Sequence, residues 1–521
     1  MRRGLVALVL LLGGLVVVPA SAVTLPTVTQ QQVDADRPVP VPATAVCRMT
    51  IMQHDFASSY GAPFVGTYKP TCHGPWSEVV QTLTSTVSGD QYDRDVYIAI
   101  GHSVLLDGST SEPCCTGNAV TWTVQRDITP YIPVLTKAQP VMVELDNVTN
   151  STYTGVYDTT VSLAFYAVGA HAPAGIHPDV ILPVSSPSRS TPMLTISKDG
   201  QTVGQSVVFP RNLVRLEGEL YADGHGPCEE FWWTDPSNCA GTPYREVAVL
   251  VDGRLAGAAP TYPVTYTGAD GPGLWEPIPS PRAWDLRPYD VDLTPFVALL
   301  TDGAPHRIQL SILDSSLASG DFWEVAANLW GWVDPGRAVT TGRLTVDQAP
   351  ASPSNATGAT SAAVYSYSAS HVLSYTGWVA TSEGVVGTSV HETMGEQAIQ
   401  EQVVDQGSWT WDSVVQTTGG TSPGSAEVSS TYSAFTSALT SFVFSDANTT
   451  TTTPRGGKPT WSSFDETMRT AAPTGIVFNG AESERYGYSD STGLCYDHRL
   501  GSAAGEVVLD ESDGFCPSAP G

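Results

Sequence analysis

Side chains that could carry out acid–base chemistry occur together at Asp93, Arg94 and Asp95. The next five residues, Val-Tyr-Ile-Ala-Ile at 96–100, alternate at the strand period and predict a half-buried strand with the three charges at its entrance. A solvated turn held by an Asp–Arg pair is one interpretation, and on residue types alone it is favoured. A catalytic site is the other, because functional carboxylates also occur in charged clusters.

Glutamates at two other places extend this set. Glu112 comes just after the following strand, and Glu229 and Glu230 follow Cys228. Two carboxylates that lie close together move one another's pKa values apart, so that one can act as an acid and the other as a base. The alternative for Glu229 and Glu230 is a charged loop tethered by Cys228, because surface carboxylates are common.

The chain around these residues is predicted to be all-β. Short runs of alternating residues recur between turns of Gly, Pro, Asn and Ser, and helical periodicity is almost absent. A first set of strands ends near Gly175 and a second set follows. Each block is long enough for a core of its own, which predicts two packed β-sandwiches at residues 46–175 and 190–345.

Three further segments are distinguished by composition. Residues 1–22 combine a basic start, an apolar run and the small residues Ala20-Ser21-Ala22, which is typical of a signal peptide and predicts a secreted protein. Residues 349–363, rich in Ala, Ser, Pro and Thr, predict a linker. Residues 364–521 carry alternating Ser- and Thr-rich runs and predict a C-terminal β-rich domain.

The charge balance and the cysteines restrict partners and cofactors. With 52 acidic and 24 basic residues the formal net charge is -28, so nucleic acid and anionic membranes would be repelled and neither is an expected partner. Metal ligation is not expected, because the cysteines and histidines lack zinc-ligand spacing. In an oxidising compartment disulfides are the default, and we expect Cys47 with Cys72, Cys228 with Cys239 and Cys495 with Cys516, while Cys114 and Cys115 form a vicinal bridge or find other partners.

Ordered motifs between residues 46 and 333 resemble one enzyme family. They are Tyr92-Asp93-Arg94, Ser111-Glu112-Pro113, Arg126–Tyr131, Glu230–Pro236, Arg245-Glu246-Val247, Val251-Asp252-Gly253, Trp275-Glu276-Pro277-Ile278 and Tyr289–Phe296. Together they resemble the peptide N-glycosidase A family, the amidases that remove N-glycans from asparagine. All of them precede residues 349–363, so the chemistry is not expected to need the residues beyond.

The bacterial peptide N-glycosidase F type is similar more weakly. Its fold is two adjacent jelly rolls with the active site between them, and the resemblance implies that fold here. It has an aspartate before an arginine, a glutamate two residues after a cysteine, and an arginine beyond a tryptophan. The matching residues in this chain are Asp93, Glu230 and, after Trp275, Arg282.

The resemblance implies roles for these residues in hydrolysis of a glycosylated asparagine side chain. Asp93 would position and activate the attacking water, and Glu230 would assist the departing glycosylamine or hold the first sugar. Arg94 or Arg282 would stabilise the oxyanion, and Glu112 would bond a sugar hydroxyl. The other substrate-binding candidates are Trp232, Trp233, Trp275 and Glu276, although tryptophans also serve as core residues and Glu276 could close a turn.

The function predicted is therefore that of a secreted, monomeric amidase without metal or cofactor. Its substrate would be an N-glycopeptide or N-glycoprotein, from which it would release the intact glycan and leave aspartate. Two alternatives stay open: an endo-acting glycoside hydrolase of the glycan core, which would also use paired carboxylates, and a non-catalytic glycan-binding protein. The sequence also contains glycosylation acceptor patterns, including those at Asn147 and Asn150.

Overall fold

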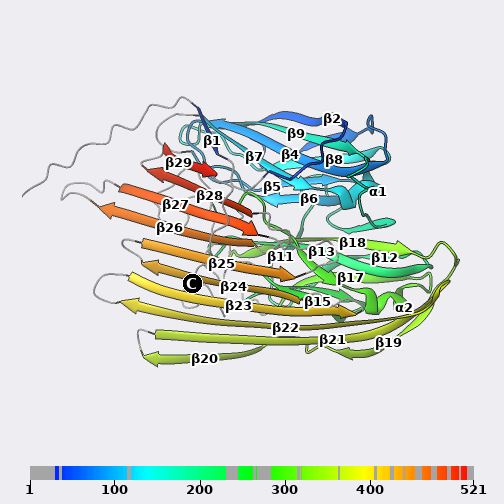
Figure 1. The fold of residues 1–521 in the computed structure, drawn as a ribbon. Helices are drawn as coiled ribbons and strands as arrows, with labels where there is room; N and C mark the ends of the chain where they lie inside the picture. Colours follow the sequence, from blue (N-terminus) through cyan, green and yellow to red (C-terminus); the bar gives the residue numbers. More distant parts are fainter. Residues whose placement is uncertain are drawn as a thin grey trace, which may run out of the picture.

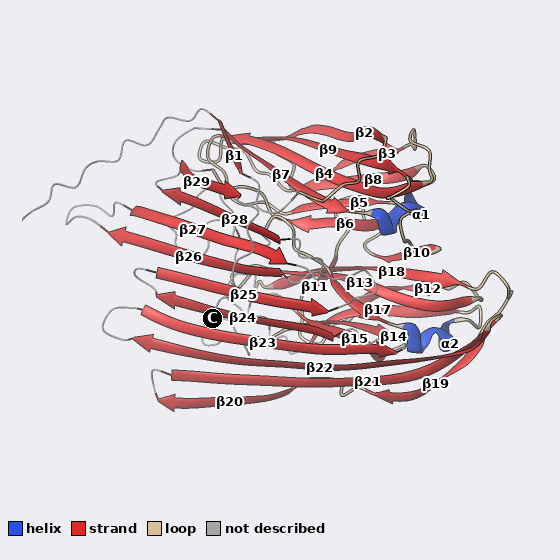
Figure 2. Cartoon of the chain, viewed as in Figure 1, coloured by secondary structure: helices blue, strands red, loops and turns tan. Residues whose placement is uncertain are grey.

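The computed structural model describes residues 30–33, 38–113, 119–229, 244–261, 266, 283–313, 317, 319–361, 364–403, 408–422, 427–437, 441–451, 460–470, 478–489, 495–503 and 506–512. Strands make up most of this part of the chain, and the helices in it are single turns (Figure 2). The prediction of an all-β protein is confirmed. Within the described residues, no helix is long and apolar enough to span a membrane.

Two sheets form the first unit, which is coloured blue to cyan in Figure 1. One has the strand order β1-β7-β4-β9-β2 and the other the order β3-β8-β5-β6. Their bounds are β1 Gln30–Val33, β2 Val46–Phe56, β3 Phe64–Tyr68, β4 Trp76–Ser88, β5 Val96–Ile100, β6 Ser103–Gly108, β7 Ala119–Asp127, β8 Gln139–Leu145 and β9 Val156–Ala167, with the short helices η1 Thr129–Tyr131 and α1 Ile132–Leu135 after β7.

Alternation along the strands places the first core between these two sheets. Along β4, for example, Leu83 and Val87 are buried while Thr84 and Thr86 are half-buried. These apolar side chains belong to a buried cluster that also contains Ile98 of β5 and Val143 of β8, from the other sheet. The two sheets are therefore packed face to face as a sandwich.

A second pair of sheets follows in the chain. One has the order β10-β18-β13-β16, with β11 also paired to β18, and the other the order β12-β17-β14-β15. Their bounds are β10 Val180–Val184, β11 Leu194–Ile196, β12 Val203–Val208, β13 Leu213–His225, β14 Glu246–Val251, β15 Arg254–Pro260, β16 Tyr289–Asp292, β17 Pro305–Leu313 and β18 Phe322–Val333, with η2 Thr294–Phe296 and α2 Val297–Leu300 after β16. The first strand of this unit thus begins at Val180.

Beyond the second unit, long strands form two more sheets, which are yellow to red in Figure 1. The first has the order β19-β21-β22-β23 with β20 paired to β21, and the second runs from β24 to β29 in sequence order. Their bounds are β19 Thr341–Gln348, β20 Ser354–Ser361, β21 Val364–Thr381, β22 Gly384–Val403, β23 Ser408–Ser422, β24 Glu427–Ser437, β25 Ser441–Thr451, β26 Thr460–Thr470, β27 Phe478–Ser489, β28 Cys495–Ala503 and β29 Glu506–Ser512. The segment 349–363, predicted as a linker, therefore contains strand β20.

Side chains of β21 and β22 complete the core of the second unit. Leu373, Tyr375 and Met394 are buried in the same apolar cluster as residues of β13 and β18. A polar contact joins the same elements, because His371 on β21 lies with Nδ1 2.7 Å from Oε2 of Glu246 on β14. These described parts of β21 and β22 therefore belong to the second folded unit.

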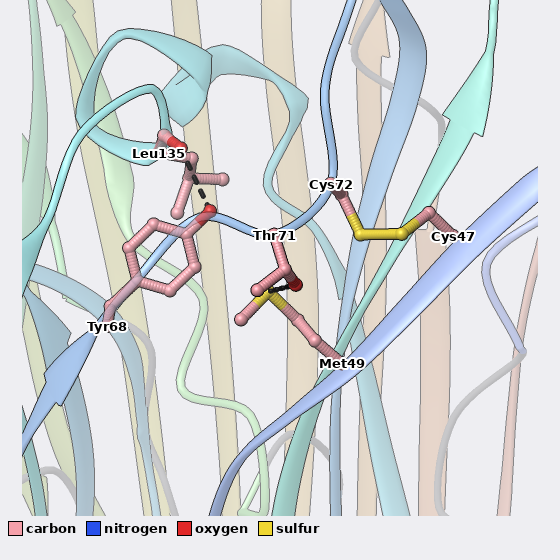
Figure 3. Close-up of a disulfide and its surroundings, with 6 residues drawn as sticks. All are labelled: Cys47, Met49, Tyr68, Thr71, Cys72 and Leu135. Atoms are coloured by element: carbon pink, nitrogen blue, oxygen red, sulfur yellow. Dashed lines mark hydrogen bonds between the residues drawn. A yellow bond between two sulfur atoms is a disulfide. The ribbon is translucent and has the colours of Figure 1, made fainter.

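One predicted disulfide is confirmed and is drawn in Figure 3. Cys47 at the start of β2 is bonded to Cys72, which follows β3. Close to it, the Tyr68 hydroxyl donates to the carbonyl of Leu135 over 2.9 Å and so ties β3 to α1. Cys228 is also disulfide-bonded. Residues 1–22 and the cysteines at 114, 115, 239 and 516 lie outside the described residues.

Candidate active site between the two sandwiches

The segment that carries Asp93 is held in place by hydrogen bonds to Tyr157. The Tyr157 hydroxyl lies 2.8 Å from the carbonyl oxygen of Tyr92 and 3.0 Å from that of Ser111. Thr110 donates to the same hydroxyl over 3.0 Å and accepts from the backbone N–H of Arg94 over 2.9 Å. The segment 91–95 and the loop 109–112 are therefore held together, and they bring the Asp93 and Glu112 segments to one place.

Gln91 and Asn147 hold the other side of this segment. Gln91 donates to the carbonyl oxygens of Val148 and Gly155 over 3.0 and 2.8 Å. Asn147 is fully buried and donates to the same Gly155 carbonyl over 3.0 Å and to Phe56 over 2.9 Å. Because this side-chain amide is already used inside the fold, Asn147 is a structural residue in the folded chain although it matches the glycosylation pattern.

Arg94 lies at the rim of the site and not beside Asp95 as an ion pair. Its Nη2 donates to Gln91 Oε1 over 2.8 Å, and its guanidinium lies 5.6 Å from the ring of Tyr92 and 5.7 Å from that of Tyr153. The two rings are themselves 4.6 Å apart. These residues form an aromatic and cationic edge that could contact a sugar.

Asp93 combines partial solvent access with a strongly perturbed acidity. Loss of hydration is the largest cause, followed by the negative charges of Glu229 and Asp95, and together they raise its pKa to about 7 against the opposing effect of Arg94. A carboxylate with a pKa near the working pH is the preferred general base, because it is deprotonated often enough and still accepts a proton readily. Asp93 therefore has the acidity that its predicted role needs.

A histidine from the second sandwich completes the centre of this cluster. His225, at the end of β13, lies with Nε2 2.8 Å from Oδ2 of Asp223 and with Nδ1 3.8 Å from Oδ1 of Asp95. Its ring stacks on Phe322 at 4.9 Å between centroids. Burial alone would lower the pKa of His225, but the charges of Asp223 and Asp95 outweigh it and raise the pKa well above its ordinary value. The imidazolium is thus the favoured form.

Further carboxylates lie near Asp95 and His225. Burial followed by neighbouring charge raises the pKa of Glu324 to about 7 and that of Glu144 to about 9, and the pKa of Asp107 is also raised by burial. Asp146 accepts from the backbone N–H of Gly61 over 3.0 Å, and its pKa is raised to about 6, mainly by burial. With so many carboxylates so close, several hold their protons near neutral pH.

The loop after β6 is clamped by the second sandwich. Ser109 N–H donates to the carbonyl of Ala283 over 2.8 Å, and Leu286 N–H donates to that of Asp107 over 2.9 Å. A Cβ atom on Gly108 would lie 2.4 Å from the carbonyl oxygen of Trp284, so only glycine permits this approach. The loop that leads to Glu112 is therefore positioned by both sandwiches.

The structure brings together some of the predicted site residues. Asp93, Arg94 and Glu112 share one region, where Glu112 is 3% exposed and its charge raises the pKa of Tyr92. Glu229 is described too, and its Oε2 accepts from the N–H of Gly226 over 3.0 Å. The other candidates, Glu230, Trp232, Trp233, Trp275, Glu276 and Arg282, lie outside the described residues.

Sequence reasoning missed His225, Asp223 and the remaining carboxylates of the second sandwich. A signal was present, because β13 reads Arg-Leu-Glu-Gly-Glu-Leu-Tyr-Ala-Asp-Gly-His from residue 215 to 225, with a polar side chain at every odd position. Residues 217, 219, 221, 223 and 225 are nevertheless all buried. A strand with one polar, buried face has to pack against another polar surface, here that of the first sandwich.

Comparison with known proteins shows the family of the chain. The chain belongs to the family of peptide N-acetyl-beta-D-glucosaminyl asparaginase amidase A, whose sequence model matches residues 26–350. A peptide-N4-(N-acetyl-beta-glucosaminyl)asparagine amidase A from Prunus dulcis is 32% identical over 347 residues, which are 60% of this chain and 58% of the relative. The aligned part thus spans less than two thirds of that relative.

Solved structures of bacterial type are also similar, at lower identity. The chain matches the structure of PNGF-II with a TM-score of 0.40 and 15% identity, over 55% of this chain and 65% of that one. It matches a crystal structure of peptide-N(4)-(N-acetyl-beta-D-glucosaminyl) asparagine amidase with a TM-score of 0.38 and 12% identity, over 56% of this chain and 97% of the other.

Proposed function

We propose that this protein is a peptide-N4-(N-acetyl-beta-glucosaminyl)asparagine amidase that releases intact N-glycans from glycopeptides and glycoproteins. The observation that carries the proposal is Asp93, a partly accessible carboxylate with a pKa of about 7 at the junction of two sandwiches. It stands in the Tyr-Asp-Arg motif of a chain that belongs to the amidase A family. Family membership favours amide hydrolysis over cleavage between sugars.

In the proposed reaction, ionised Asp93 accepts a proton from a water molecule as the water oxygen bonds to the side-chain carbonyl carbon of the glycosylated asparagine. The carbon–nitrogen bond then breaks, the nitrogen takes up a proton, and the glycan leaves as a glycosylamine. Aspartate remains in the peptide. Base catalysis of this kind contributes about 10²- to 10⁴-fold to a rate.

We assign the remaining roles from motif position and charge. Glu230 assists the departing nitrogen or holds the first sugar, and Arg94 and Glu112 bind substrate at the rim beside Tyr92. Trp232, Trp233, Trp275, Glu276 and Arg282 are assigned to substrate binding on their motifs alone. His225, as an imidazolium between Asp223 and Asp95, limits the negative charge near Asp93 and so allows Asp93 to ionise.

The proposal includes the place of action. Residues 1–22 have the pattern of a signal peptide, and the disulfide of Cys47 with Cys72 is the type of bond that persists in an oxidising compartment. Both features support a secreted enzyme that meets glycoproteins outside the cytoplasm, and we propose that it acts as a monomer.

Mass spectrometry of a defined glycopeptide, treated in ¹⁸O-labelled water, tests the proposal. An amidase leaves aspartate that carries one ¹⁸O atom and releases a glycan that contains both core N-acetylglucosamine residues. An endo-acting glycoside hydrolase would leave asparagine bearing one sugar, and a glycan-binding protein would leave the substrate intact. Either of these two results would overturn the proposal.

A further inference from the structure

A cleft lies between the sandwiches, at the other end of strand β13 from the candidate active site. It has a volume of about 890 Å³ and is lined by Arg126 and η1 from the first sandwich and by Arg215, Glu217 and Trp332 from the second. We call it the distal cleft. A volume of this size is in the range of small-molecule sites.

The distal cleft is separate from the candidate active site. Glu217 and His225 are eight positions apart on β13, which corresponds to about 26 Å along a strand. Between them, Tyr97 and Val104 of the first sandwich pack with Tyr221 and Ala326 of the second in a buried cluster, here called the interface cluster. The distal cleft and the candidate active site therefore lie toward opposite ends of one interface.

Two of the arginines that line the distal cleft are paired with carboxylates. Arg215 is in contact with Glu217, and its guanidinium also lies 4.3 Å from the centre of the Trp332 ring. Arg126 Nε lies 3.6 Å from Oδ1 of Asp285. A ligand with a net charge would have to compete with these pairs, whereas a neutral ligand would not.

The chemistry of the lining selects among neutral ligands. Carboxylates only accept and guanidinium groups only donate, so a lining that contains both suits a ligand whose groups do both. Neighbouring hydroxyl groups of a sugar have this property, and the pyranose ring also has an apolar face for the edge of an indole such as Trp332. An apolar small molecule would leave this polar lining without solvent, at a cost in free energy.

We infer that the distal cleft is a second, non-catalytic carbohydrate-binding site that takes a short segment of a neutral oligosaccharide. The inference goes beyond the proposed reaction, because binding here does not require hydrolysis. The glycan that is being cleaved, or a second glycan of the same glycoprotein, could be held in the distal cleft while cleavage takes place at the candidate active site.

The test uses the full-length protein labelled with 5-fluorotryptophan and ¹⁹F NMR. The resonance of Trp332 is assigned by the Trp332→Phe variant, and the protein is titrated with the trimannosyl-chitobiose pentasaccharide. We expect a saturable shift of the Trp332 resonance. The resonance of Trp378 on β21, which is 36% exposed, should not move and serves as the internal control.

Two variants localise the effect. Glu217→Gln keeps the shape of the side chain and should weaken the response about five-fold or more by removing a charged acceptor. Asp290→Ala tests an exposed lining residue whose loss should leave the fold intact. A Trp332 resonance that does not respond to the sugar, or that responds only to a Lys- and Arg-containing peptide, would overturn the inference.

The outcome is distinct from that of the proposed reaction. Turnover of a glycopeptide is measured on the same labelled protein, and the Asp93→Asn variant should lose turnover while the Trp332 shift persists. A protein that binds the sugar at Trp332 without any turnover would refute the amidase and keep the second site. Turnover without a shift of the Trp332 resonance would refute the second site and keep the amidase.

Discussion

Tyr97 on β5 of the first sandwich donates its hydroxyl hydrogen to Asp223 on β13 of the second, over 2.8 Å. The same Asp223 oxygen is 2.8 Å from His225, so one carboxylate connects both sandwiches to the histidine. The geometry of the candidate site therefore depends on how the two sandwiches are positioned relative to one another. The same contact positions Asp95, which lies two residues before Tyr97.

Removal of the Tyr97 hydroxyl should weaken both stability and activity. Tyr97→Phe deletes a buried hydrogen bond to a charged group, which is worth about 1.5 to 3 kcal/mol. Denaturant unfolding of Tyr97→Phe, Asp223→Asn and the double variant forms a thermodynamic cycle. We expect a coupling free energy of about 1 kcal/mol or more. Additive effects of the two substitutions would show that the contact is not formed in solution.

Replacement of Asp93 should abolish turnover without loss of the fold. Asp93→Asn preserves size and removes the base, so kcat on a glycopeptide should fall by about 10²-fold or more. Binding of the uncleaved glycopeptide should be retained. Asp55→Asn, at an exposed position on β2, is the matched control and should be as active as the wild type. Wild-type turnover by Asp93→Asn would move the base to another carboxylate.

The buried carboxylates predict how stability depends on pH. In the folded state the pKa of Asp93 and that of Glu324 are raised to about 7 and that of Asp146 to about 6, so the folded chain binds more protons than the unfolded chain between about pH 4 and 7. Stability should then fall as pH rises through this window. The raised pKa of His225 acts in the same direction.

Thermal denaturation at pH 5 and pH 8 measures this effect. We expect the higher melting temperature at pH 5, and a smaller difference in Asp93→Asn, which no longer has this ionisable group. A melting temperature that is equal at the two pH values, or higher at pH 8, would mean that the carboxylates are ionised at little cost in the folded protein.

The strands after residue 350 should be needed for stability. Leu373 on β21 is fully buried in the core of the second sandwich, so Leu373→Ala should lower the free energy of unfolding by about 2 to 5 kcal/mol. Its neighbour Val372 is 40% exposed, and Val372→Ala should cost less than about 1 kcal/mol. A chain that ends at Pro350 would lack β21 and β22 and should not unfold cooperatively. Equal unfolding free energies for the two variants would argue against this packing.

Asn147 gives a prediction about the loop beneath Asp93. Asn147→Asp would replace two donated hydrogen bonds with a buried carboxylate that faces the carbonyl oxygens of Phe56 and Gly155. We expect a loss of about 3 kcal/mol or more in stability. Asn150→Asp, at an exposed site three residues later, is the control and should be close to neutral. The two variants are compared by urea unfolding, and similar midpoints would contradict the buried role of Asn147.

Much of the fold could be predicted from the sequence, because strand alternation is a local property. The sequence predicts a strand at 96–100, which is β5, and pairs Cys47 with Cys72 from their nearness in the chain. The prediction that this strand is only half-buried is wrong, because all five of its residues are buried. The role of residues after 350 was harder to predict. The alternating Ser- and Thr-rich runs after residue 364 predict a separate C-terminal β-rich domain, whereas Leu373 and Tyr375 of β21 lie in the core of the second sandwich.

The candidate site was predictable only on the side of the first sandwich. Asp93, Arg94 and Glu112 were found because short motifs surround them. Asp223 and His225 could not be placed from spacing, since their partners Tyr97 and Asp95 are more than a hundred residues away. Only the polar face of β13 indicated a buried polar surface, and it did not say what would cover it.

The interface cluster has a mechanical consequence. Tyr97, Val104, Tyr221 and Ala326 lie between the candidate active site and the distal cleft. The sandwiches could therefore rotate about this cluster. A small rotation would move them apart at the distal cleft and closer together at the candidate active site, or the reverse. An oligosaccharide bound in the distal cleft beside Trp332 would rotate one sandwich relative to the other. The distance between Asp93 and the second sandwich would then change.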